Sequence, residues 1–143
     1  MTRTPHHTGW AGALAVAAEV SRRGYDAALT LGNTPALDLI CSSPEGSTFT
    51  VQVKSSSSPN WIRISLKYLE CHPAPGLFFA VVLVPIDADL PFAFHILTHR
   101  EVCALYAKQS RTRRDGVPLK PGHEGIGWAD AIKHASRWDK LPS

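Results

Sequence analysis

The chain has 143 residues, the size of one ordinary domain that can bury a hydrophobic core without disulfides or structural metals. Its 15 Lys and Arg against 12 Asp and Glu give a net charge of +3, an excess that permits a polyanionic partner without requiring one. The sequence contains no repeat, no long low-complexity segment and no linker. We therefore expect residues 1–143 to form a single domain.

The cysteines and the apolar segments exclude further classes of protein. Cys41, Cys71 and Cys103 are odd in number and contain no C-x-x-C pair, which argues against a disulfide framework and a thiolate zinc site. We expect a protein of the reducing cytoplasm. Residues 10–18 have the length of a signal-peptide core but continue into charged residues in helical register, and residues 77–84 are too short to span a bilayer. We expect no membrane association.

The N-terminal part predicts one helix followed by three strands. The helix covers residues 10–23, is rich in alanine, and has Thr8 as its N-cap and Gly24 as its C-terminal stop. The strands follow from the apolar pattern and from the positions of Gly, Asn and Pro. They are residues 25–31, a turn at 32–35, residues 36–41, a loop at 42–47, and residues 48–55.

The C-terminal part predicts two strands and two helices. Residues 59–75 are left undecided, because alternation at 61–64 suggests a strand whereas 65–71 fit a helical turn or two. The predicted elements are a strand at 77–84 with apolar residues on both faces, a strand at 92–97, a helix at 98–109 with Thr98 and Glu101 as a capping box, and a helix at 128–138. The order predicts an α/β fold with an N-terminal helix, a mixed sheet of four or five strands, and flanking helices.

Three polar residues interrupt the predicted second and third strands. Side chains two residues apart share a face of a strand, so Gln52 and Lys54 lie together. In a hairpin whose loop is centred on Glu45, Asp38 stands opposite Gln52 and shares that face. A slip of two residues preserves the grouping, whereas a one-residue slip or a bulge destroys it. Burial of such groups is costly unless they bind a ligand or one another.

Glu19 is a further candidate for the same site. It lies at the edge of the apolar face of the first predicted helix, where its carboxylate could point towards the sheet. The alternative is an ordinary solvated helix acid that pairs with Arg22 or Arg23. The sequence supports both interpretations equally.

These residues resemble the motif of the PD-(D/E)XK nuclease superfamily, whose restriction-endonuclease-like fold is shared with Holliday junction resolvases. The resemblance rests on Glu19 in an opening helix, on Asp38, and on Gln52-Val53-Lys54. It extends along the chain through RRGYDAALTLGNTPALDLIC, VQVKSSS, FAFHILTHREV and GIGWADAIKHASRWDKL. The sequence is similar to a group of small stand-alone proteins of this superfamily, many with Q-x-K.

The resemblance implies a Mg²⁺-dependent (or Mn²⁺-dependent) deoxyribonuclease with the site on a β-hairpin. It implies that Asp38, Gln52 and the main-chain carbonyl of Val53 bind the ion, and that Glu19 holds it through water. Lys54 would orient the attacking water or stabilise the developing negative charge. Such an ion prefers oxygen ligands and activates water for phosphodiester hydrolysis. DNA is the implied partner, and a homodimer or higher homo-oligomer is the implied assembly.

Two departures from the superfamily pattern keep other functions open. Leu37 stands where the motif often has proline, and Gln52 cannot ionise, so the site has one negative charge fewer to attract a cation. The first alternative is a catalytically degenerate DNA-binding module of the same fold. The second is a protein-interaction accessory of a mobile element or defence system, in which Asp38 and Lys54 merely pair.

Other residues are candidates for DNA contacts or for structural roles. Ser56 shares the Lys54 face and is a candidate phosphate contact. His95 and His99 have a zinc-ligand spacing only within one helix, so a structural role is favoured. Trp10, Trp128 and Trp138 are interpreted as packing residues rather than as stacking platforms for bases. The basic segment between Lys108 and Lys120 fits a solvated loop or a phosphate-contacting one, the latter through Arg111, Arg113 and Arg114.

Overall fold

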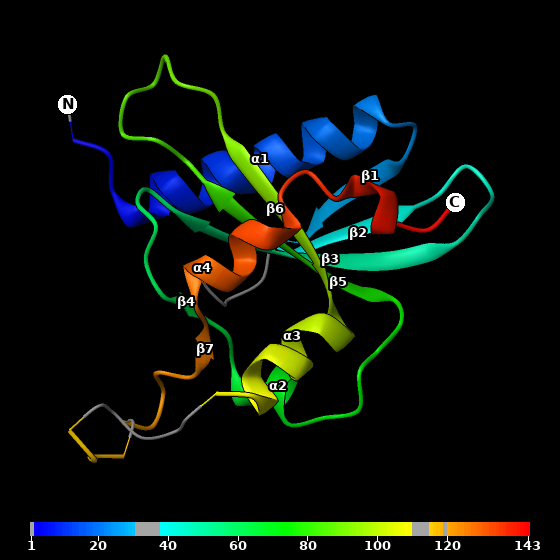
Figure 1. Ribbon diagram of the computed structural model, residues 1–143. Coiled ribbons are helices and arrows are strands. Elements are labelled where there is room, and N and C mark those ends of the chain that lie inside the picture. The colour runs from blue at the N-terminus through cyan, green and yellow to red at the C-terminus, as the bar shows by residue number, and fades with distance from the viewer. Residues whose placement is uncertain (1, 31–37, 110–114, 119) are drawn as a thin grey trace.

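The structure is a computed structural model that describes residues 2–30, 38–109, 115–118 and 120–143 (Figure 1). One long helix stands at the start of the chain, four strands follow it, and short elements stand at the end. The elements are α1 (Pro5–Arg22), β1 (Asp26–Thr30), β2 (Asp38–Ser42), β3 (Thr48–Ser56), β4 (Ile62–Arg63), α2 (Leu66–Leu69), β5 (Leu77–Leu83), β6 (Ala93–Thr98), α3 (His99–Ala107), β7 (Gly125–Ile126), α4 (Trp128–Ala131) and two 3₁₀ turns, η1 (Ile132–His134) and η2 (Trp138–Lys140).

The main sheet has five strands in the order β1-β2-β3-β5-β6. Strands β3 and β5 pair in parallel, and the other neighbours pair antiparallel. The predicted α/β fold with an N-terminal helix, a mixed sheet and flanking helices is therefore confirmed. The undecided residues 59–75 contain both a strand, β4, and a short helix, α2, and β4 pairs with β7 in a second, two-stranded sheet.

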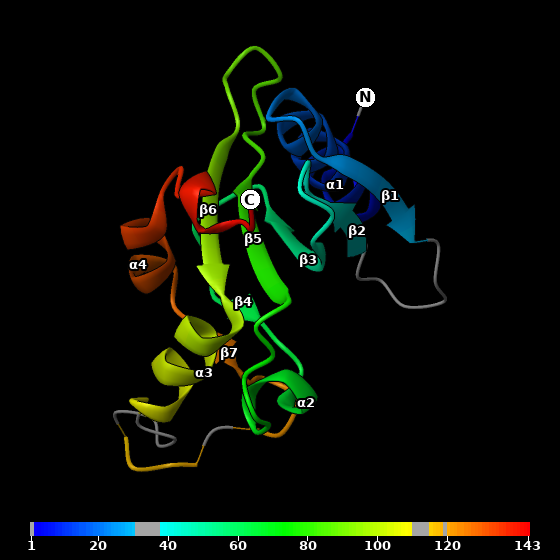
Figure 2. The ribbon, with the colours of Figure 1, turned by 90° about the vertical axis from the view of Figure 1, so that its right-hand side faces the viewer.

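Apolar side chains cover both faces of the sheet, and β5 contributes to both layers. Helix α1 packs on one face against a cluster that includes Leu39, Val51 and Val53. The short elements α2, α3, β7 and α4 pack on the other face, around Phe79 and Val81 of β5. Figure 2 shows α1 and α4 on opposite sides of the sheet. The prediction that residues 77–84 form a central strand covered on both faces is confirmed.

Helix α1 begins earlier than its sequence pattern indicates. Thr4 is the N-cap, its side chain accepts a hydrogen bond from the backbone of His7, and Pro5 occupies the first helical turn. The predicted cap, Thr8, is instead a buried residue inside the helix. The predicted stop is correct, because Gly24 has φ = +89°, a backbone conformation that L side chains rarely adopt.

The predicted last helix, residues 128–138, is wrong beyond its first turn. Helix α4 ends at Ala131, and after η1 the chain turns back towards the outer edge of β6. Ala135 forms an isolated bridge with His95, and Ser136 donates its N–H to the Phe94 carbonyl. Ser136 has φ = 55°, so pairing with a strand edge has replaced continuation of the helix. Helix α3 carries the predicted capping box between Thr98 and Glu101.

Two features bear on the class of protein. Cys41, Cys71 and Cys103 are free thiols, and burial raises the pKa of Cys41 to about 11. No helix within the described ranges combines the length and the apolar character needed to cross a bilayer.

Candidate functional site

Asp38 and Gln52 are directly opposed in the β2–β3 hairpin. The loop that fixes this register has Glu45 at its centre: Ser43 donates its N–H to the Ser47 carbonyl at 2.8 Å, and the Ser43 hydroxyl accepts the Ser47 N–H at 2.9 Å. Gly46 supplies the positive φ of the loop, +90°. The predicted register is therefore confirmed.

Lys54 lies on the same face of the sheet as Asp38 and Gln52. In the parallel pair, Gln52 stands beside Phe79 and Lys54 beside Val81, both of which face α2, α3 and α4. Val53, between them, points its side chain to the α1 face. The structure thus brings three of the predicted site residues together, on the face that α1 does not cover.

Two buried oxygen atoms of this group have no hydrogen-bond donor in the described structure. They are Asp38 Oδ1 and Gln52 Oε1. Gln52 is only 3% exposed, so bulk solvent does not reach this oxygen freely. An unsatisfied buried polar group costs roughly 1–3 kcal/mol, which a ligand that supplies positive charge would recover. Among the described residues, the hairpin therefore presents two buried oxygen atoms without a donor.

Lys54 is half-buried, and its surroundings have opposing effects on its pKa. Burial lowers the pKa of Lys54 below its ordinary value of 10.5, the negative charge of Asp38 opposes that change, and the nearby Lys67 reinforces it. Among the ion pairs of the described residues, none joins Asp38 to Lys54. A simple structural salt bridge therefore does not account for the two residues.

The depressed pKa of Lys54 makes stability depend on pH at the alkaline end. Below the folded-state pKa the lysine is charged in both the folded and the unfolded state, so the cost of burial is fully present. As pH rises from that pKa towards 10.5, the folded state loses its proton first and this cost is relieved, so the free energy of unfolding increases.

We expect Asp38→Asn to lower the Lys54 pKa further, because it removes the negative charge that raises this pKa. NMR titration of the lysine side chain measures this, and an unchanged or higher pKa would contradict the expected proximity.

Glu19 is not brought to this group. Its carboxylate accepts hydrogen bonds from Arg22 at 3.0 Å and from Arg23 at 3.1 Å, and α1 packs on the opposite face of the sheet. Of the two interpretations, the structure shows the contacts of the second, a helix acid paired with its own helix, and a role for Glu19 at the metal site stays a prediction. The face that a helix covers is decided by the packing of the whole chain, which the helical period of Glu19 does not reveal.

We expect Glu19→Gln to lower the free energy of unfolding by less than about 1 kcal/mol, the usual range for ion pairs near a surface. The increase in melting temperature on addition of Mg²⁺ should be the same for this variant as for the parent. Thermal unfolding with and without the ion measures both quantities. A smaller Mg²⁺-induced increase in melting temperature in the variant would show that Glu19 contributes to binding of the ion.

A metal site on the hairpin would need amide and main-chain oxygen atoms in addition to a carboxylate. Within the described part of the chain, no group of three or more His, Cys, Asp or Glu could hold a metal ion. The hairpin offers one carboxylate, Asp38, together with the Gln52 amide oxygen and the Val53 main-chain carbonyl. This donor set suits a hard cation that keeps several water ligands, such as Mg²⁺.

The remaining predicted residues have other environments. Ser56 follows on the Lys54 face, but its hydroxyl already donates to the Ser58 carbonyl at 2.6 Å. His95 is buried and donates from Nδ1 to the Val81 carbonyl at 2.8 Å, and His99 Nδ1 accepts the Ala74 N–H at 2.8 Å. Both histidines are therefore structural, as expected. The candidate phosphate contacts Arg111, Arg113 and Arg114 lie outside the described residues.

A cavity of about 360 Å³ adjoins Lys54 and contains side chains that sequence reasoning did not assign to the site. Its walls come from the end of β3, from β4 and the segment before it, and from the start of α4. The lining residues are Lys54, Ser55, Ser56, Asn60, Trp61, Ile62, Arg63 and Trp128. An exposed tryptophan and arginine in one short alternating stretch, 61–64, was the available signal for this wall.

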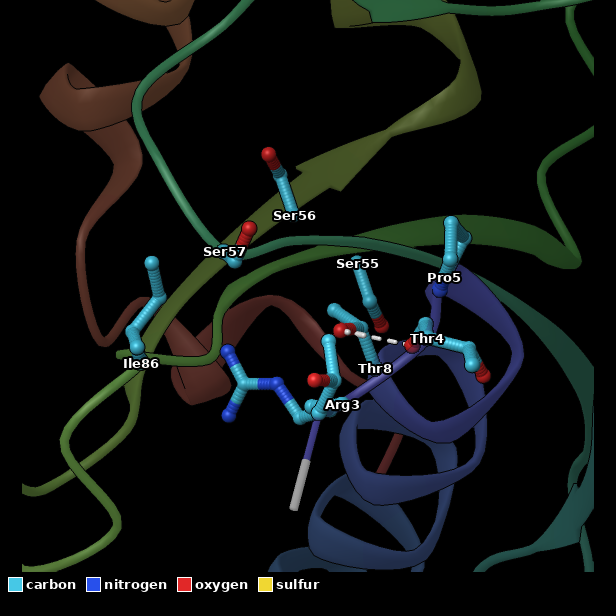
Figure 3. A pocket seen from close by; sticks show the side chains of 9 residues that line it. Arg3, Thr4, Pro5, Thr8, Ser55, Ser56, Ser57 and Ile86 are labelled. Carbon is cyan, nitrogen blue, oxygen red and sulfur yellow. Dashed lines mark hydrogen bonds between the residues drawn. The ribbon is translucent and has the colours of Figure 1, made fainter.

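A second cavity, of about 500 Å³, lies at the N-terminus of α1 (Figure 3). Arg3 closes one side of it, donating to the Val84 and Pro85 carbonyls at 2.7 Å each. Ser55 points towards α1, where a Cβ on Gly12 would overlap the Ser55 hydroxyl. The guanidinium is thus engaged with main-chain carbonyls at the end of β5, and this cavity lies on the opposite side of β3 from Asp38 and Gln52.

The chain matches no protein-family model, no curated protein and no solved structure.

Proposed function

We propose that the protein is a Mg²⁺-dependent deoxyribonuclease of the PD-(D/E)XK type that hydrolyses phosphodiester bonds in DNA. One observation carries the proposal: two buried oxygen atoms, on Asp38 and Gln52, have no hydrogen-bond donor among the described residues and lie on one strand pair beside a half-buried lysine. An oxygen-seeking cation satisfies both atoms at once. Neither core packing nor an Asp38–Lys54 ion pair gives a reason for this arrangement.

Each residue has a defined role in the proposed reaction. Asp38, Gln52 and the Val53 carbonyl would hold the ion, Mg²⁺ or Mn²⁺. When bound there, the ion would supply a water of lowered pKa and positive charge beside the phosphate. Lys54 places its ammonium beside the developing charge, and its partly buried position strengthens that interaction relative to bulk water.

The setting of the enzyme is part of the same proposal. A chain of 143 residues with one such hairpin needs a second copy to act on both strands of a duplex, so we propose a homodimer or a higher homo-oligomer. Its free cysteines suit a reducing compartment, and we propose the cytoplasm.

A second candidate function is a DNA-binding module of the same fold without catalysis. The observation that favours it is the single carboxylate of the donor set, because Gln52 adds no negative charge to attract the cation. Such a module would retain DNA through its basic side chains and leave it intact.

The decisive experiment incubates the protein with supercoiled, linear, single-stranded, nicked and four-way-junction DNA in Mg²⁺, Mn²⁺ or chelator. Cleavage that requires the ion and disappears in Asp38→Asn supports the nuclease. Retention of DNA without cleavage, measured by electrophoretic mobility, supports the second candidate. Absence of both cleavage and retention rules out both candidates.

A further inference from the structure

We propose that the cavity beside Lys54 binds an unpaired nucleotide of the DNA, with its base against Trp61 and Trp128 and its phosphate near Arg63. This inference rests on the proposed function and adds a substrate class, namely DNA with unpaired bases at the reacting strand. The cavity, of about 360 Å³, lies within the range of small-molecule sites, about 300–1,000 Å³.

The cavity is continuous with the candidate active site through Lys54. This residue stands beside Val81 in the sheet, and Trp128 at the start of α4 packs in the same layer. The opposite wall is β4 and the residues before it, which arrive from the segment between β3 and β5. A group in the cavity therefore contacts the lysine that the proposed reaction uses.

Both indole rings are held in place while part of each remains accessible. Trp61 is 45% exposed, yet its Nε1 donates to the His123 carbonyl at 2.8 Å, which fixes the ring plane. Trp128 is half-buried and packs edge-on against His95, with ring centroids 5.2 Å apart and an interplanar angle of 76°. A large aromatic side chain that is exposed but immobilised loses little conformational freedom when it binds a partner.

The charged and polar lining points to a nucleotide rather than to an apolar ligand. Arg63 is exposed, with Nη2 3.0 Å from His123 Nδ1, and Asn60 donates to the Ser58 hydroxyl at 2.7 Å. Two cations, Arg63 and Lys54, thus line the same cavity as two indole rings. Proteins that bind single-stranded nucleic acid combine these elements: bases stack on aromatic rings and cations follow the phosphates.

A base in this cavity cannot belong to an intact duplex. Bases of a duplex have their faces covered by neighbouring base pairs, so an enzyme reaches them only after they are flipped out or already single-stranded. The cavity therefore selects DNA with an unpaired nucleotide next to the bond that Lys54 faces. Bubbles, overhangs and single strands fit this description, and uninterrupted duplex does not.

The test compares the binding of two labelled probes by fluorescence anisotropy in chelator, where no cleavage occurs. One probe is oligodeoxythymidylate and the other is a phosphodiester of equal length built from abasic units. We expect the parent to bind the first about tenfold more tightly, because stacking of one base is worth roughly 5- to 150-fold in affinity. Equal affinity for the two probes would overturn the inference and requires no variant.

Variants then assign the preference to the cavity. Trp61→Ala should bring the dissociation constants for the two probes to within about twofold of each other, and Trp61→Phe should retain most of the preference. The matched control is Phe92→Ala, because Phe92 is 39% exposed and does not line the cavity. A preference that persists in Trp61→Ala would also overturn the inference.

The outcome separates this inference from the proposed nuclease. Preference for the probe with bases, without cleavage of any DNA, would support the nucleotide site and reject the proposed nuclease activity. Cleavage that requires Lys54, without preference for the probe with bases, would support the nuclease activity and reject the nucleotide site.

Discussion

Lys54→Ala should lower the rate of DNA cleavage by roughly 10²- to 10³-fold, the usual cost of removing one group that stabilises charge in a transition state. The lysine is half-buried, so water replaces its ammonium poorly. The rate of product formation on the DNA that the parent cleaves best, at saturating Mg²⁺, measures the effect. DNA affinity should change much less, because one lost phosphate contact is a small part of an extended interface.

The matched control is Lys133→Ala, which also removes one positive charge. Lys133 is 74% exposed and lies 3.8 Å from Asp130, away from the hairpin. Its replacement should leave the cleavage rate within about threefold of the parent. Equal losses in the two variants would mean that Lys54 acts through general charge alone, and the catalytic role would then be rejected. Melting temperatures of both variants establish that each is folded.

The second large effect is expected from Gln52→Glu. In chelator, the new carboxylate is buried directly opposite Asp38, and we expect the free energy of unfolding to fall by about 1–3 kcal/mol. With Mg²⁺ we expect Gln52→Glu to be more stable than the parent, because two carboxylates hold the cation more strongly than one. An ion that binds only the folded state stabilises it by about 2.7 kcal/mol at 100 times its dissociation constant. The increase in melting temperature on adding Mg²⁺ should therefore be larger for Gln52→Glu than for the parent.

The control for this experiment is Gln52→Met, which has a similar length and neither oxygen nor charge. It should unfold at or above the parent's temperature in chelator, because it removes a buried oxygen that has no donor. It should also show a smaller Mg²⁺ effect than the parent. If millimolar Mg²⁺ changes the melting temperature of none of the three proteins, the hairpin does not bind the ion.

The hairpin could be predicted from the sequence because its determinants are local. Alternation fixes which residues share a face, and the loop centred on Glu45 fixes which residues are opposed, so Asp38 and Gln52 follow from a short stretch of chain. The start of α1 was missed because its cap combines Thr4 with His7 rather than with Glu or Gln. The turn that follows α4 and η1 was missed because no Gly or Asn marks the positive φ at Ser136.

The remainder of the candidate site depends on contacts between distant parts of the chain. Trp61 and Trp128 line one cavity because β4, which follows Trp61, pairs with β7, which precedes Trp128. No local sequence pattern predicts a pair of two-residue strands. The sequence left Glu19 open between a site acid and a helix acid, because the choice between two faces of a sheet is made by the packing of the whole chain. Local patterns thus gave the motif, and the packing of the chain decides what surrounds it.

The parallel pairing of β3 with β5 gives the two halves of the site different positions in the order of folding. The Asp38–Gln52 half belongs to a hairpin that closes over a five-residue loop, 43–47. Closing such a short loop costs the chain little conformational entropy. The Trp61 half belongs to the crossover between β3 and β5, which becomes ordered only when β5 joins the sheet and β7 arrives from far along the chain. Newly made chains would therefore acquire the hairpin with its paired oxygens first. The Trp61 wall, which we propose binds an unpaired nucleotide, would follow only when β7 had left the ribosome.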